Sequence, residues 1–370
     1  MCNCNRALAS VKLHKCAMTN PVLRRLILQL TTLSLIVALL LLHLSSDVNY
    51  RVSQSCSCAC RDPVTNISHD FCYRYNTTNR GLAMCCHLVL PYVVKLALLD
   101  EPTKHHVDEK ITIETHPPII TGASDTHYGE LRHAIASTQL HFAQSRLIVY
   151  DFGLSDANLQ SLKRICEKIE MRKFDFHQWP KSVTMMYNYK WKPILLAQLV
   201  NEFHHGFWWI DSSIRWRSNR TQHIYNSIKS GRRSPYMLID NSWHSVYAAT
   251  HPDMYRYLPT DFDGLKRSSM FGGGFVFIVR TRDSLDIIKW LVLCALQPGC
   301  IDPPNAQLLC RFGASQSTDY GNCHRFDQSA INILLANRYR FQTHLYTPGE
   351  SIAFAVVDRR DVGPVPKECD

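Results

Sequence analysis

The sequence lacks the motifs of several large enzyme classes. It contains no Gly-x-x-x-x-Gly-Lys-Ser/Thr loop, no Gly-x-Gly-x-x-Gly after its first predicted strands, no Gly-x-Ser-x-Gly elbow and no His-Glu-x-x-His pair. These absences argue against P-loop sulfotransferases, dinucleotide oxidoreductases, α/β-hydrolases and zincins. A basic stripe interleaved with aromatic residues is also missing, so nucleic acid is not an expected partner.

Acidic residues are absent from residues 1–46, although this segment carries the basic residues Arg6, Lys12, Lys15, Arg24 and Arg25. Residues 26–46 are uncharged and rich in Leu, Ile and Val, and as a helix they would extend about 31 Å at ~1.5 Å per residue. Because the basic flank precedes this run, we expect a single-pass type II membrane protein. Residues 1–25 are then a cytosolic tail, 26–46 a signal anchor, and the remainder lumenal.

The alternative for this apolar run is a cleaved signal peptide. The long basic tail and the missing small-x-small site before Asp47 disfavour it. The run is short for a transmembrane segment, which suits the thinner membranes of the endoplasmic reticulum or Golgi.

Cysteine usage indicates an oxidising compartment. Three of the 15 cysteines, Cys2, Cys4 and Cys16, precede the apolar run, which leaves 12 beyond it. An even number in a lumenal segment predicts disulfides, and six cysteines crowd a stem that we expect over residues 47–116. The alternative, a zinc site at Cys56-x-Cys58-x-Cys60, lacks the usual Cys-x(2–4)-Cys spacing.

Three N-glycosylation motifs, at Asn66, Asn76 and Asn219, also lie beyond the span. None has Pro at its middle position, so all three are compatible with a lumenal location. The alternative for each motif is an ordinary polar loop.

Beyond residue 117, strand patterns alternate with helix patterns. This alternation predicts an α/β fold with a mixed, mostly parallel sheet flanked by helices, in one lumenal domain over residues 117–370. The run Leu88 to Leu99 in the stem predicts one helix or strand. Ser155 is placed to cap a helix that continues to Ile169. The expected strands cover 119–121, 146–151, 171–176, 207–211 and 236–240, and the other helices cover 130–142, 191–203, 223–229, 284–296 and 327–337. Within 270–279, the three glycines 272–274 are followed by the apolar run 275–278.

Asp211 is the strongest candidate for a site residue. It follows the apolar run Phe207 to Ile210, and open α/β sheets bind ligands beyond the carboxyl ends of their strands. A carboxylate there can hold a divalent cation or a nucleotide ribose. The alternative is an Asp that caps the next helix or pairs with Arg215. Ser213 stands where a second acid would complete an Asp-x-Asp metal motif, and a hydroxyl is a poor ligand for a hard cation.

Other polar residues lie near predicted strand and helix ends. Lys192 is either a point charge for a phosphate or a solvated lysine on a helix face. The glycines 272–274 either let a ligand approach the backbone or form a bulge at a sheet edge. Asp327 and Gln328, at the start of the last helix, either bond sugar hydroxyls or cap that helix.

Three further residues are weaker candidates. His324 is a possible ligand or base, although one of 18 histidines means little without geometry. Asp151 and Asp240 close apolar runs, and each is either a general base or ribose partner or, by default, a turn residue.

Six stretches resemble a nematode-expanded family of type II membrane proteins thought to be GT-A-like glycosyltransferases. They are Thr121–His127, Val149–Ser155, Trp191–Pro193, Trp209–Ser213, Cys294–Leu296 and Cys323–Ala330. The chain is more distantly similar to glycogenin-type GT-A enzymes, which bind manganese and the donor diphosphate with a strand-end Asp-x-Asp. Asp211, Gly273 and the pair Asp327–Gln328 match positions of that pattern.

The resemblance implies a glycosyltransferase that uses a nucleotide-sugar donor and a glycan, protein or lipid acceptor in the secretory pathway. It implies catalytic roles for Asp211 and Asp327, donor contacts by Lys192, Asp211, Ser213, Gly273 and Gln328, and a Mn or Mg ion at Asp211. Ser213 departs from the pattern and argues against the metal. The alternative is therefore a catalytically inactive carbohydrate-binding or interaction module. Retaining and inverting chemistry both stay open.

Overall fold

The computed structural model describes residues 25, 28–37, 56–99, 110–165, 169–348 and 354–366. The chain divides into two compact units, Met1–Val52 and Ser53–Asp370. In the first unit residues 28–37 are helical. In the described part of the chain, no helix combines the length and apolarity needed to cross a membrane. Most of the predicted anchor, at residues 26, 27 and 38–46, and the basic tail before Arg25 lie outside the described residues.

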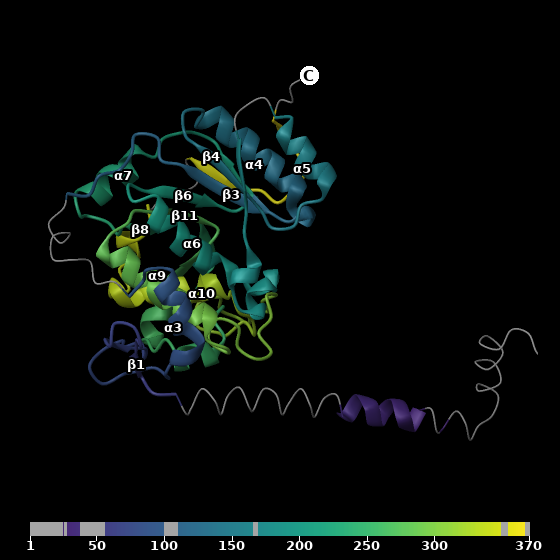
Figure 1. The fold of residues 1–370 in the computed structure, drawn as a ribbon, viewed down its shortest axis with the longest axis vertical. Coiled ribbons are helices and arrows are strands. Elements are labelled where there is room, and N and C mark those ends of the chain that lie inside the picture. The colour runs from purple at the N-terminus through teal and green to yellow at the C-terminus, as the bar shows by residue number, and fades with distance from the viewer. Residues whose placement is uncertain are drawn as a thin grey trace, which may run out of the picture. The chain divides into compact units, whose positions relative to one another are not determined.

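The second unit is built around a six-stranded sheet (Figure 1). Strands β5, β4, β3 and β6 are parallel, and β11 runs antiparallel to both β6 and β8. The predicted mixed, mostly parallel sheet is thus confirmed. In spatial order the strands are β5 (Ile169–Lys173), β4 (Leu147–Asp151), β3 (Ile119–Ala123), β6 (Phe207–Ile210), β11 (Phe275–Ile278) and β8 (Tyr236–Leu238).

Strand order reverses at β3, which has β4 on one side and β6 on the other. Such a switch point opens a crevice beyond the carboxyl ends of the strands, because the connections leave in opposite directions. Strand β8 points the same way as β6, since both are antiparallel to β11. The residues after β6, after β8 and before β11 therefore share one edge of the sheet.

Helices cover both faces of the sheet (Figure 1). Successive strand residues point to opposite faces, so Trp208 packs in one apolar cluster and Trp209 in the other. The Trp208 cluster includes residues of α4 (Tyr128–His141), α5 (Asp156–Lys163) and α7 (Gln222–Lys229). The Trp209 cluster includes residues of α6 (Trp191–Glu202), α9 (Arg282–Leu296) and α10 (Asp327–Arg338).

The Cys-rich segment contributes a small hairpin, β1 (Ala59–Arg61) and β2 (Ser68–Asp70), and the helix α3 (Cys86–Lys95). Helix α3 contacts α9, and the backbone N–H of Cys85 donates to Oε1 of Gln297 at 2.8 Å. The segment is thus part of the same compact unit as the sheet. The predicted domain division at residue 117 stays a prediction.

Ten described cysteines beyond the apolar run form disulfides, which confirms the prediction for them. The pairs are Cys56–Cys85, Cys58–Cys72, Cys60–Cys86, Cys294–Cys300 and Cys310–Cys323. The zinc alternative at Cys56, Cys58 and Cys60 is wrong, because an oxidised sulfur cannot act as a thiolate ligand. Cys166 and Cys369 lie outside the described residues.

Two predicted element boundaries are wrong. Ser155 caps α5 as expected by accepting a hydrogen bond from the N–H of Asn158, but the helix ends at Lys163 rather than Ile169. Ile169 instead begins β5, where it pairs with Leu147. An apolar residue four positions after Ile165 fits a helix or a strand equally well, and only pairing with β4 decides between them. The strand predicted over 171–176 is therefore β5, which lies two to three residues earlier in the chain, at Ile169–Lys173.

Candidate functional site

Asp211 lies directly after β6, at the edge of the sheet where the crevice opens. Its backbone N–H donates to the carbonyl of Gly274 at 2.6 Å, which continues the pairing of β6 with β11. Its Oδ1 accepts hydrogen bonds from Nζ of Lys192 and from Nε1 of Trp209, both at 2.9 Å. The side chain of Asp211 is 36% exposed, so its carboxylate is held by hydrogen bonds on the buried side and is open on the other side.

Lys192 is the cation beneath this carboxylate. Although Lys192 is only 3% exposed, it lies on α6 with its ammonium 2.9 Å from Asp211 and 3.7 Å from Oδ2 of Asp327. Burial alone would lower the pKa of Lys192, but the two carboxylates raise it above its ordinary value. The solvated-lysine alternative is wrong. Because the ammonium already has two carboxylate partners, its direct contact with a donor phosphate stays a prediction.

The three glycines between β10 (Ser269–Phe271) and β11 each face one acid. A Cβ on Gly274 would lie 2.2 Å from Oδ2 of Asp211, and one on Gly273 would lie 3.0 Å from Oδ2 of Asp327. A Cβ on Gly272 would meet Asp240 at an ordinary 3.5 Å. The glycines therefore form the turn that brings the three acids around one point, rather than a bulge at a sheet edge.

Asp327 is the first residue of α10 and is 7% exposed. Burial raises its pKa to about 6, because Lys192 opposes this effect only in part and Asp211 adds to it. The residue before it, Phe326, has a φ of 46°, a left-handed value that costs a non-glycine residue about 1–3 kcal/mol. The chain thus accepts local strain at the position that turns Asp327 and Gln328 toward the glycines.

Asn332 holds α10 in this position. Its side-chain amide accepts from the N–H of Phe271 at 2.9 Å and donates to the carbonyl of Phe271 at 2.7 Å. This pair of bonds ties the helix to the residue before the glycine turn. Sequence reasoning missed this role, because an Asn inside a helix pattern gives no signal of its own.

A cavity of about 130 Å³ lies above these residues. Ser213 lines it next to Asp211, and Gln328 donates from Nε2 to Oγ of Ser242 at 2.8 Å in its wall. Asp240 follows β8 and lines the same cavity, where burial raises its pKa despite the nearby Arg359. Of the predicted site residues, Asp211, Ser213, Asp240 and Gln328 line the cavity. Lys192 lies against Asp211, and Asp327 lies between Lys192 and Gly273.

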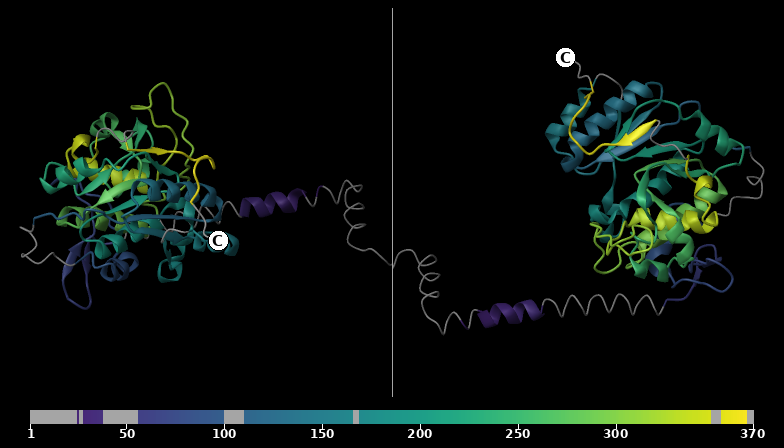
Figure 2. Two further views of the ribbon diagram at one scale, coloured as in Figure 1. Left: turned by 90° about the horizontal axis from the view of Figure 1, so that it is seen from above. Right: turned by 180° about the vertical axis from the view of Figure 1, so that it is seen from behind.

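Two arginines of this cavity were not predicted. Arg325 belongs to the stretch before α10, whose pattern drew attention to Asp327 instead. Arg359 follows β12 (Ala355–Val357), a short strand that pairs with β7 (Ile214–Trp216) and is yellow in Figure 2. The N–H of Asp358 donates to the carbonyl of Ser213 at 2.7 Å, which anchors this segment beside the cavity. No motif connects Arg359 with a site 148 residues earlier in the chain at Asp211.

The donor atoms around Asp211 do not suit the predicted Mn or Mg ion. A hard cation takes several carboxylate or carbonyl oxygens. Both oxygens of Asp211 lie within 3.2 Å of the Lys192 ammonium, whose charge opposes a second cation. Ser213 adds only a hydroxyl. Around Asp211 the described residues include no group of three His, Cys, Asp or Glu side chains close enough together to hold a metal ion.

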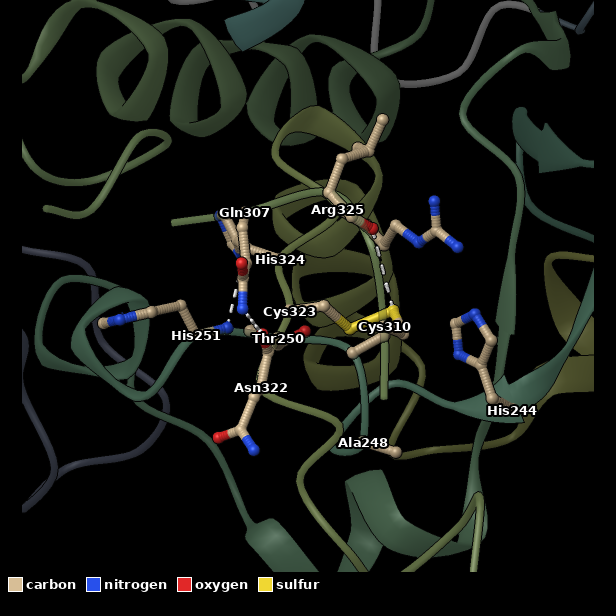
Figure 3. Close-up of a disulfide and its surroundings, with 12 residues drawn as sticks. His244, Ala248, Thr250, His251, Gln307, Cys310, Asn322, Cys323, His324 and Arg325 are labelled. Atoms are coloured by element: carbon tan, nitrogen blue, oxygen red, sulfur yellow. Dashed lines mark hydrogen bonds between the residues drawn. A yellow bond between two sulfur atoms is a disulfide. The ribbon is translucent and has the colours of Figure 1, made fainter. Parts of the chain in front are cut away.

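His324 is a structural residue, so its prediction as a ligand or base is wrong. It is fully buried, and its Nδ1 accepts from the N–H of His251 (Figure 3). Its Nε2 bonds the carbonyl of Ile301. Burial lowers its pKa to about 3. His324 and Arg325 turn to opposite sides of the chain next to the disulfide of Cys323 (Figure 3).

Asp151 has the turn role expected by default. Its Oδ1 accepts from the N–H groups of Gly153 and Leu154, both at 2.7 Å. The pairing predicted as an alternative for Asp211 is also wrong, because Arg215 donates to the carbonyls of Ser212 and Ile214 instead. The three asparagines of the glycosylation motifs, Asn66, Asn76 and Asn219, are all exposed, as a modified residue must be.

Comparisons with known proteins found one family model and several distantly similar solved structures. A family model described as a protein of unknown function, DUF1647, matches residues 58–197. Among curated proteins none matches the sequence. Similar solved structures include the galactosyltransferase LgtC with donor and acceptor sugar analogues, at 13% identity over 59% of this chain and 70% of that one, with a TM-score of 0.35.

An active-site mutant of LgtC matches at 12% identity over 59% of this chain and 69% of that one, with a TM-score of 0.33. The bifunctional glycosyltransferase WbbM, without ligand, matches at 12% identity over 60% of this chain and 38% of its own, with a TM-score of 0.37. At this level of similarity, the activity of these enzymes does not transfer to the chain.

Proposed function

We propose that this chain is a glycosyltransferase that moves a sugar from a nucleotide-sugar donor to a hydroxyl group of a glycan, protein or lipid acceptor. One observation carries the proposal. Three carboxylates, Asp211, Asp240 and Asp327, approach a glycine turn at the switch point of the sheet. Carboxylates at such a crevice accept hydrogen bonds from ribose and sugar hydroxyls, and glycines let the ligand lie close to the backbone.

Each residue has a role in this proposal. Asp211, fixed by Lys192 and Trp209, accepts from a hydroxyl of the donor, with Ser213 beside it. Asp327 and Gln328 orient the transferred sugar next to Gly273. Lys192 is a positioning residue, because it acts on the donor through Asp211.

The reaction breaks the bond between C1 of the sugar and the diphosphate oxygen, and the electron pair leaves with the nucleoside diphosphate. The acceptor oxygen forms the new bond to C1 and gives up its proton. Asp240 is the candidate base, because burial raises its pKa and makes its carboxylate a better proton acceptor.

We further propose a lumenal location in the endoplasmic reticulum or Golgi, with residues 26–46 as a type II anchor. Disulfides and three exposed glycosylation motifs support it. In the described part of the apolar run, the hydroxyls of Thr31 and Thr32 both donate to the carbonyl of Leu28. Internal hydrogen bonds of this kind remove the cost of placing a hydroxyl in lipid.

The full-length protein in detergent tests the function by isothermal titration with a panel of nucleotide sugars and by detection of released nucleoside diphosphate. We expect one nucleotide sugar to bind and to be consumed when an acceptor is present. Asp211→Asn should abolish both signals. Asp319→Asn is the matched control, because Asp319 accepts from the N–H of Ser315 in a turn outside the cavity.

The alternative function is a carbohydrate-binding module without catalysis, which Ser213 favours because it replaces the second acid. Such a module would bind glycan but would bind no nucleotide sugar. That result would contradict the transferase proposal.

A further inference from the structure

Arg325 and Arg359 both line the cavity that Asp211 also lines. They come from two separate segments, one from the stretch before α10 and the other from the segment after β12. Burial lowers the pKa of Arg325, and the positive charge of Arg359 lowers it further. The two cations therefore lie close enough to repel each other.

These guanidiniums are not neutralised by the acids of the site. Asp211 instead pairs with the ammonium of Lys192 at 2.9 Å. Asp240 also lines the cavity, but among the described residues it forms no ion pair at 4.0 Å or less with either arginine. Within the described residues, no ion pair at 4.0 Å or less is formed by either Arg325 or Arg359, and the buried Nε of Arg325 has no hydrogen-bond partner. The cavity thus presents unpaired positive charge to a ligand.

From this charge arrangement, we propose that Arg325 and Arg359 bind the diphosphate of the donor and take the place of a divalent cation. The inference rests on the proposed function and names how its leaving group is held. Guanidinium groups suit phosphates because their N–H groups form two parallel hydrogen bonds to a pair of oxygens. A guanidinium group also keeps its proton, and therefore its positive charge, at physiological pH.

The chemistry of the leaving group explains why two cations are needed. When the bond from C1 to the phosphate oxygen breaks, the diphosphate gains the electron pair and one more negative charge. Preorganised cations stabilise this charge as it develops. The Asp211 region cannot hold a metal for this purpose, because Lys192 already occupies its carboxylate.

The experiment is isothermal titration of the full-length protein in detergent with uridine, guanosine, cytidine and adenosine diphosphates and the matching nucleosides. Each titration is run with EDTA and with MnCl2. We expect one diphosphate to bind, with the same affinity in both buffers. Arg359→Gln should weaken it on the order of tenfold to a hundredfold, since it removes a charge-assisted contact, and should leave the nucleoside unaffected.

Three variants sharpen this test. Arg359→Lys keeps the charge but loses the forked geometry, so its loss should be smaller. Arg325→Gln should resemble Arg359→Gln. Arg360→Gln is the matched control, because Arg360 is 76% exposed and its guanidinium pairs with Asp358. Its affinity should equal that of the wild type.

The two proposals fail in different ways. If EDTA abolishes binding, Mn restores it and Arg359→Gln has no effect, a metal holds the diphosphate and this inference is overturned, while the transferase proposal stands. If no diphosphate binds in either buffer to protein that remains folded, both proposals are overturned. Arg359 lies in an exposed segment, so a folding defect in Arg325→Gln would leave Arg359→Gln as a valid test.

Discussion

The Nζ atom of Lys192 lies 2.9 Å from Oδ1 of Asp211, and it does so from the buried side of the carboxylate. A strand-end acid that is held in this way keeps its charge and its orientation while the other side faces the cavity. The same ammonium lies 3.7 Å from Asp327, so one cation serves two acids. Removing it would leave two carboxylates facing each other without compensation.

Lys192→Met should therefore destabilise the protein by about 3–5 kcal/mol, because it leaves uncompensated buried charge. Lys190→Met is the matched control, since Lys190 is equally buried but pairs with Asp302, which is 22% exposed. Lys190→Met leaves one carboxylate without its cation, whereas Lys192→Met also leaves the 7% exposed Asp327 without one, so the control variant should lose less. Urea unfolding followed by tryptophan fluorescence measures both. Equal losses would contradict the shared role of Lys192.

Gly274→Ala should disrupt the site locally. The new Cβ would lie 2.2 Å from Oδ2 of Asp211, so the carboxylate has to move. A displacement of this size can cost on the order of 100-fold in transfer rate. Gly272→Ala adds the same methyl group two residues earlier, where the nearest atom is at 3.5 Å. Its loss of rate should be clearly smaller, because no carboxylate has to move, and an equal loss in both variants would argue against the close approach of Gly274 to Asp211.

The raised pKa of Asp327 predicts a specific pH dependence of the free energy of unfolding. Its folded pKa of about 6 exceeds its ordinary value of 3.8, so between these values the folded state holds a proton that the unfolded state has lost. Stability from this group therefore falls as pH rises from about 4 to 6, by about 3 kcal/mol, and then stays constant. Asp327→Asn should remove this decline.

The comparison with Asp327→Asn is needed because His324 acts in the opposite direction. Its folded pKa of about 3 means that the unfolded state gains a proton first as the pH falls below 6.5, which lowers stability. This contribution is common to both proteins and cancels in the difference. Urea unfolding at a series of pH values gives that difference, and a flat curve would contradict the raised pKa of Asp327.

We expect the disulfide Cys310–Cys323 to stabilise the segment that carries the site residues before and at the start of α10. It closes a loop with a sequence separation of 13 just before Arg325 and Asp327. Replacing both cysteines with serine should cost about 3 kcal/mol and weaken donor binding, because the strained turn at Phe326 loses its anchor. The pair Cys294–Cys300, at the end of α9, is the control. Calorimetric titration of its double serine variant should show unchanged binding.

Glycan mapping tests the proposed topology. In protein from a eukaryotic secretory host, Asn66, Asn76 and Asn219 should carry N-linked glycans, because all three are exposed and lie beyond the apolar run. Each Asn→Gln change should remove one glycan, seen as a mobility shift that N-glycosidase treatment eliminates. Thr78→Val, which breaks the motif of Asn76 without touching the asparagine, should give the same shift as Asn76→Gln. Unmodified asparagines throughout would place this part of the chain on the cytosolic side.

The sequence by itself determined the central elements and the strand-end position of Asp211. Periods of 2 and 3.6 residues reflect backbone geometry, so β4, α6 and β6 follow from local patterns. The even cysteine count also indicated disulfides, because oxidation of cysteines depends on the cellular compartment and not on which cysteine each one pairs with. The helix end predicted at Ile169 was wrong, because strand pairing with β4, and not the hydrophobic period, decides that Ile169 begins β5.

Only the tertiary structure decided which charges meet. Lys192 and Asp327 are 135 positions apart, and Asp211 and Arg359 are 148 apart, so no local pattern connects them. The order of strands around β3, the antiparallel β11 and the pairing of β12 with β7 bring these groups to one edge of the sheet. Burial then fixed their electrostatics, because the same Lys or Asp side chain has a different pKa once its neighbours replace water.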